Sequence, residues 1–78
     1  MSNASTLHRL ASDFTQGRPL PARIGSTPLI TWLTSLSGDK RECGFPDLAI
    51  QLGVTTERPW VGEVAATLRF RLEEQAAG

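Results

Sequence analysis

Apolar residues recur along this chain at spacings of three and four, the repeat of an amphipathic helix, and they predict four helices. The first is predicted from Ser5, its cap, to about Gln16, and the second from Pro28 to Leu36. The third is predicted from about Pro46 to Leu52, and the fourth over residues 59–74. Because each has one apolar face, they predict an all-α fold, a compact four-helix domain around one core.

Proline and glycine mark the first long turn. Gly17 is expected to end the first helix, and Pro19 is one of two prolines that prevent its continuation. Residues 18–26 are therefore expected to form an extended connector, with Leu20 and Ile24 packed onto the core.

Capping residues are expected at two later helix starts. Ser26 or Thr27 would cap the second helix, with Pro28 in its first turn. Thr55 or Thr56 would cap the fourth. These residues suit helix starts because their side-chain oxygens can accept hydrogen bonds from free backbone N–H groups.

The last predicted helix has an alternative. Its apolar face holds Val61, Val64, Ala65, Leu68 and Leu72, and this spacing turns Phe70 away from the core. Residues 68–72 also alternate strictly between apolar and basic, which is typical of a strand. Such a strand could pair with Pro21–Ile24. We expect the helix.

Seventy-eight residues suffice for one small core, so we expect a single helical domain over residues 5–75. Residues 1–4, Met-Ser-Asn-Ala, are expected to be a tag remnant or a disordered leader, and residues 76–78 a frayed tail. The composition, 40% hydrophobic and 21% charged, is typical of a folded globule. With no signal peptide in this chain and one cysteine, we expect a cytoplasmic protein.

Charge and residue counts exclude several classes of function. Eight Lys and Arg balance eight Asp and Glu, which argues against a strongly basic nucleic-acid cradle and a charge-driven membrane binder. The apolar runs are too short to span a bilayer. One cysteine excludes an internal disulfide, and with one histidine the usual zinc-ligand sets cannot form. We expect no membrane, metal or cofactor partner.

No set of residues points to catalysis. His8 is expected on the polar side of the first helix, and Cys43 in an exposed, charged loop over residues 40–44. The sequence places no base or acid beside either side chain. We therefore expect a protein that is not an enzyme.

One segment carries a family resemblance. Residues 47–55, Asp-Leu-Ala-Ile-Gln-Leu-Gly-Val-Thr, resemble the first half of a helix-turn-helix unit. That motif has a small residue where two helices meet, a glycine four residues later, and then an apolar residue that fills the core. Ala49, Gly53 and Val54 occupy these places in order.

Over about residues 28–70 the predicted order of helices is similar to that of winged-helix domains. The resemblance implies that the helix at 28–36 supports the motif and that the last helix is presented to DNA. It requires Val54 and Val61 to pack into one core with Trp32 and Leu33.

The resemblance implies a non-catalytic DNA-binding module, regulatory or an accessory domain of a larger protein. Duplex binding depends mainly on basic side chains that neutralise phosphates. The candidates are Lys40, Arg41, Arg58, Arg69 and Arg71, with polar contacts from Thr55, Thr56 and Thr67. Glu63, Glu73 and Glu74 also lie on the last helix and lower its positive charge.

That acidity keeps a second hypothesis open, a small protein–protein interaction module such as an adaptor or inhibitor. It would bind through Trp60, Phe70 and Phe45, with the loop over residues 40–45. Aromatic side chains are enriched at the centres of protein interfaces. Trp60 could equally pin the last helix to the core.

Overall fold

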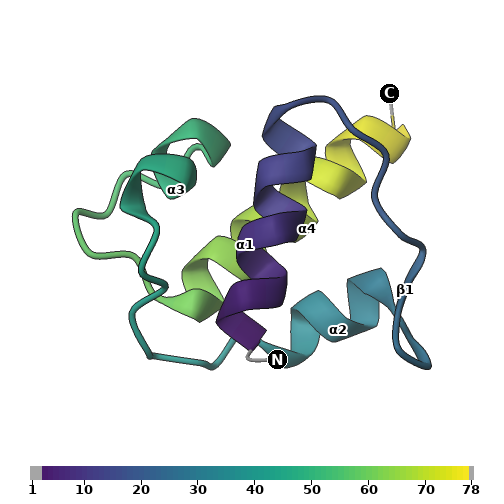
Figure 1. Cartoon of the computed structure of the whole chain (residues 1–78), viewed down its shortest axis with the longest axis horizontal. Helices are drawn as coiled ribbons and strands as arrows, with labels where there is room; N and C mark the ends of the chain where they lie inside the picture. The colour runs from purple at the N-terminus through teal and green to yellow at the C-terminus, as the bar shows by residue number, and fades with distance from the viewer. Residues whose placement is uncertain (1–2, 78) are drawn as a thin grey trace.

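The computed structural model describes residues 3–77, and within them the chain forms four helices and one short hairpin. The elements are α1 (Asn3–Thr15), β1 (Arg23–Ile24), β2 (Thr27–Pro28), α2 (Leu29–Ser35), α3 (Pro46–Leu52) and α4 (Val61–Ala77). Helix α1 lies across α4, with α3 on one side of the pair and α2 on the other (Figure 1). The predicted mostly helical, compact domain is confirmed.

The core forms where the apolar faces of all four helices meet. Buried side chains come from α1 (Leu7, Leu10, Ala11), α2 (Leu29, Leu33), α3 (Ala49, Leu52), α4 (Val61, Val64, Ala65, Leu68) and the loops (Leu36, Cys43, Val54). No polar or charged residue among residues 3–77 is buried. Removal of apolar area from water is therefore the main stabilising term, at about 25 cal/mol per Å².

Two helices end at glycine in the same way. Gly17 has φ +75°, its N–H donates to Phe14 O, and the Arg18 N–H donates to Asp13 O. Gly53 has φ +113° and follows α3 with the same pair of bonds, from Gly53 N to Ile50 O and from Val54 N to Ala49 O. This arrangement is the Schellman motif. It favours glycine because the residue after the helix has a positive φ, which glycine adopts without steric cost.

The fold is not purely α-helical, which corrects the all-α prediction. Arg23–Ile24, in the predicted extended connector, pairs antiparallel with Thr27–Pro28, although Pro28 was predicted to begin the second helix. Gly25 makes the turn at φ +61°. The strands have two residues each, too few to show an alternating pattern in the sequence. Leu20 and Ile24 pack against the core, as expected.

The start of α2 also differs from the prediction. Pro28 stands at the N-cap, and no side chain caps the helix, so Ser26 and Thr27 do not have the expected role. Thr27 is instead in β2, and the Leu29 N–H donates to Ala22 O at 2.9 Å. The hairpin therefore sets the start of α2.

Helix α4 is continuous from Val61 to Ala77, so residues 67–72 are helical, as expected. Its start is capped from within: Glu63 Oε1 accepts a bond from the Trp60 N–H, and Oε2 accepts one from the Thr56 hydroxyl. Thr56 thus contributes near the start of α4, but through a side-chain pair with Glu63. The last turn of α4 reaches Ala77, so it includes residues 76 and 77, which were expected to belong to a frayed tail.

Gly62 lies where α4 meets the loop that follows α2. A Cβ at this position would lie 2.5 Å from Ser37 O and 2.9 Å from both Leu36 O and Asp39 O. The Gly62 N–H donates to Asp39 O at 2.9 Å, so the loop backbone lies directly against the first turn of α4. Glycine is the residue that this close approach admits.

The packing of the helices differs from the arrangement that the resemblance implied. Helix α3 packs on α1 and α4, and α2 packs on α4; no Cα atom of α2 lies within 8 Å of a Cα atom of α3. Helix α2 therefore does not occupy the supporting place beside α3. The turn at Gly53 is confirmed, and Val54 and Val61 share one core with Leu33 and the half-buried Trp32.

Candidate functional site

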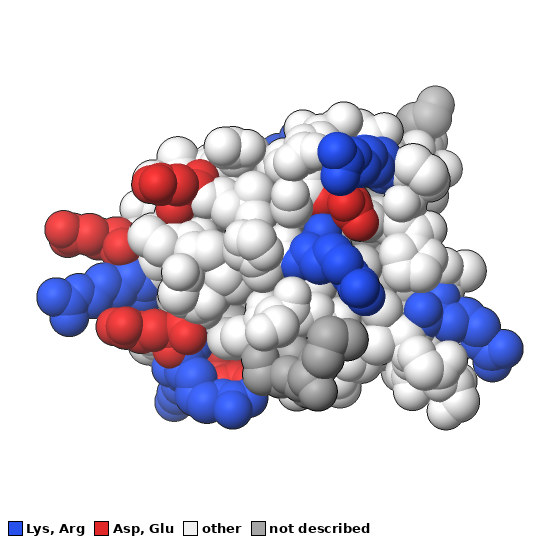
Figure 2. All heavy atoms as spheres, in the orientation of Figure 1, with Lys and Arg blue, Asp and Glu red and all other residues white. Residues whose placement is uncertain are grey.

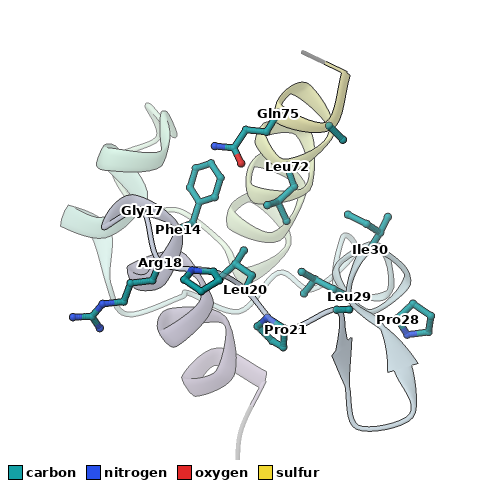
Figure 3. A pocket seen from close by; sticks show the side chains of 13 residues that line it. Phe14, Gly17, Arg18, Leu20, Pro21, Pro28, Leu29, Ile30, Leu72 and Gln75 are labelled. Atoms are coloured by element: carbon teal, nitrogen blue, oxygen red, sulfur yellow. The ribbon is translucent and has the colours of Figure 1, made fainter.

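An open apolar groove of about 720 Å³ lies on the described part of the chain. Its walls come from three regions: the end of α1 with the connector, the start of α2, and the last turns of α4 (Figure 3). The apolar side chains that line it include Phe14, Leu20, Leu29, Ile30 and Leu72. We call this feature the apolar groove.

Local sequence explains each wall of the apolar groove. The Schellman turn at Gly17 sends the chain away from α1, and two prolines keep the connector extended beside Leu20. The hairpin then returns the chain so that Leu29 and Ile30 open α2. Leu72 comes from α4, lies partly buried against the core and lines the groove.

Apolar side chains in the groove remain partly in water. Leu20 and Leu72 are half-buried, and Ile30 is 38% exposed. In Figure 3, Leu20 points between Phe14 and Leu72 into the hollow. A partner that covered these side chains would remove their apolar surface from water, the main driving force of protein association.

Charge is sparse around the apolar groove. Among the described lining residues, Arg18 is the only one with a charged side chain. Its side chain is 66% exposed, and its ion pair with Asp13 is long, 3.7 Å from Nη1 to Oδ1. Exposed pairs of this kind contribute little to stability, so the guanidinium is available to another anion.

The predicted DNA-contacting residues lie on three separate segments. Lys40 and Arg41 lie in the loop after α2, and Arg41 forms a two-pronged ion pair with Asp39, with Nε–Oδ1 at 3.0 Å and Nη2–Oδ2 at 2.6 Å. These hydrogen bonds lower the pKa of Asp39 to about 2 and raise the pKa of Arg41. The Arg41 charge is therefore largely neutralised within its own loop.

The two arginines of α4 are also engaged. Arg69 Nε bonds Glu73 Oε1 at 2.9 Å, one helical turn away. Arg71 Nη1 donates to Leu52 O at 3.0 Å, and Arg71 Cζ lies 5.9 Å from the centre of the Phe14 ring. Arg71 thus satisfies a carbonyl at the C-terminus of α3 and links three helices, a structural role that the sequence analysis missed.

The remaining predicted contacts lie before and within α4. Thr55 and Arg58 are exposed in the loop after α3, and Thr67 is half-buried on α4. Acidic and basic side chains are interspersed on the face shown in Figure 2, without one continuous basic area. The structure therefore does not gather the predicted cations on the visible face.

The aromatic residues of the second hypothesis are exposed to different degrees. Trp60 is 44% exposed and Phe70 is 61% exposed, in agreement with the predicted outward position of Phe70. They are ten residues apart, which is about 15 Å along a helix. Phe45 is half-buried, packs against the core, and meets the His8 ring edge-on with centroids 5.1 Å apart.

Cys43 is buried, which corrects the prediction of an exposed loop thiol. Its N–H donates to Pro59 O, and the neighbouring Val61 N–H donates to Arg41 O, so residues 41–43 run antiparallel to residues 59–61. The sequence could not show this pairing, because it joins two irregular segments that are distant along the chain.

Residues 3–77 contain no group of three or more His, Cys, Asp or Glu side chains that could hold a metal ion. Over the same range, no helix has the length and apolar character needed to cross a bilayer. Searches of protein-family models, curated proteins and solved structures find no match to this chain.

Proposed function

We propose that this chain is a non-catalytic protein-interaction module that binds its partner through the apolar groove. The observation that carries the proposal is the groove itself, about 720 Å³ and lined by apolar side chains except for Arg18 and Gln75. Among the described residues that line it, Arg18 alone is charged, and it lies at the edge of the groove (Figure 3). A concave apolar surface with few polar groups is the usual form of a binding site.

DNA binding, the first function expected from the sequence, is the competing proposal. The exposed Thr55 and Arg58 favour it. The ion pairs of Arg41 and Arg69 weigh against it, as does the bond from Arg71 to Leu52 O, because a phosphate would have to displace these partners. Protein interaction is therefore the better-supported function.

The proposal can be tested with a displayed library of random 12-residue peptides selected against the full chain. Selected peptides are expected to lose at least tenfold in affinity for Ile30→Asp, because the substitution places a charge in the groove. Ile50→Asp is the matched control, since Ile50 is 63% exposed on α3 and lies outside the groove. The control should bind like the wild type.

Two results would contradict the proposal. One is a selection in which every binding peptide is insensitive to Ile30→Asp. The other is salt-sensitive binding of duplex DNA, with amide shifts centred on residues 55–70, by a chain that selects no peptide. The second result would establish DNA binding instead.

A further inference from the structure

We infer that the apolar groove receives one amphipathic α-helix of a partner protein, with an acidic residue of that helix beside Arg18. This inference rests on the proposed function and specifies the partner's chemistry.

The walls offer little to an extended peptide. Added strands bind mainly through main-chain hydrogen bonds to a free edge. Here Pro19, Pro21 and Pro28 have no N–H, and the Leu29 N–H is already bonded to Ala22 O. The connector part of the wall therefore offers a strand few main-chain donors, those of Leu20 and Ala22. A helix forms its own main-chain hydrogen bonds, so it needs none from the walls of the groove.

The apolar side chains suit one helical face. They converge on the hollow from several directions: Phe14 and Leu72 on one side, Leu20 at the centre, and Ile30 on the other side (Figure 3). An amphipathic helix presents apolar residues at i, i+3, i+4 and i+7, as one stripe that such a groove can cover.

Charge at one edge of the groove indicates where the acidic residue of the bound helix lies. In Figure 3, Arg18 lies at the opposite side of the groove from Ile30 and Pro28. No described lining residue is acidic, and the guanidinium is 66% exposed with a long ion pair to Asp13. A carboxylate at the Arg18 end of the partner helix therefore meets an opposite charge, whereas a lysine there meets a like charge.

The experiment uses two displayed peptide libraries and the full chain. In the helical library, an alanine- and glutamine-rich 14-residue frame is randomised along one face and at both ends. In the extended library, proline at alternate positions prevents helix formation. The helical library is expected to yield groove binders, identified by loss of binding to Ile30→Asp, with Leu, Ile, Met or Phe at i, i+3, i+4 and i+7.

The charge is tested by reversal. For the wild type, Asp or Glu at the end near Arg18 should improve affinity about threefold over Gln. Arg18→Glu should reverse this preference in favour of Lys, while Arg9→Glu, on the exposed surface of α1 and outside the groove, should leave it unchanged. Reversal by Arg18→Glu alone would place the carboxylate beside Arg18.

The experiment distinguishes failure of the helix inference from failure of the proposed function. Groove binders that come from the extended library alone, or that show no charge preference, overturn the helix and leave the proposed function standing. Binders from neither library overturn both. Sedimentation of the free chain also tests the occupant: a dimer abolished by Ile30→Asp would show that a second copy fills the groove, and the inference would be wrong.

Discussion

Replacement of Gly62 by alanine should destabilise the protein, although helix propensity alone predicts the opposite. In a helix, alanine is favoured over glycine by up to about 1 kcal/mol. Against this, the new Cβ would lie 2.5 Å from Ser37 O and 2.9 Å from two further carbonyl oxygens. These are backbone atoms, so the conflict cannot be relieved by rotating a side chain.

The size of the effect follows from what must move. Overpacking of this kind costs about 1–3 kcal/mol. A shift of the loop would also weaken the bonds from Gly62 N to Asp39 O and from Val61 N to Arg41 O, each worth about 1 kcal/mol. After subtraction of the propensity gain, Gly62→Ala should lower the free energy of unfolding by about 2 kcal/mol. For a chain of this size, that lowers Tm by roughly 8–16 °C.

The assay is urea denaturation followed by circular dichroism at 222 nm. Gly38→Ala is the matched control, because Gly38 lies in the same loop and a Cβ there would meet nothing within 4 Å. The control should change stability by less than about 0.5 kcal/mol. A Gly62→Ala variant at least as stable as the wild type would refute the close approach of the loop to α4.

Three further predictions concern side chains described above. Arg71→Ala should lower the free energy of unfolding by about 1 kcal/mol, because it leaves Leu52 O without its hydrogen bond. Arg69→Ala, the control, should change the free energy of unfolding by less than about 0.5 kcal/mol. Equal losses for the two variants in urea denaturation would contradict this. In an NMR titration the Asp39 carboxyl should have a pKa of about 2, and Arg41→Gln should bring it towards 3.8. Because the pKa of Asp39 is lower in the folded than in the unfolded chain, the Asp39–Arg41 pair stabilises the fold above about pH 4, and this contribution is lost as the pH falls towards 2. A titration midpoint near 3.8 for Asp39 in the wild type would show that the pair is absent. The Cys43 thiol should react with a water-soluble disulfide reagent only as fast as the protein opens, so immediate labelling of the native chain would show that it is accessible.

Local patterns in the sequence were sufficient for most of the helical structure. The third helix has the predicted bounds, Pro46–Leu52, and ends at Gly53, because a proline start and a glycine stop are signals contained within a few residues. Residues 67–72 are helical and Phe70 faces outward, since the apolar spacing extends over several turns.

Features made by distant segments could not be predicted in this way. Cys43 is buried because its strand-like segment pairs with residues 59–61, and nothing near Cys43 indicates that pairing. The apolar groove joins Phe14, Leu20 and Leu72, which are up to 58 positions apart in the chain. Arg71 was predicted to contact phosphate because its charge is visible in the sequence, whereas its bond to Leu52 O depends on how α3 and α4 cross.

The separation of α2 from α3 has a consequence for how the domain opens. Both helices pack on α4, their Cα atoms lie more than 8 Å apart, and the hairpin contacts α2. We therefore expect the hairpin and α2 to open together and to exchange their amide hydrogens as one cooperative unit. Because the same unit carries Leu29 and Ile30, a bound partner would slow its exchange, so recognition and local unfolding are thermodynamically linked.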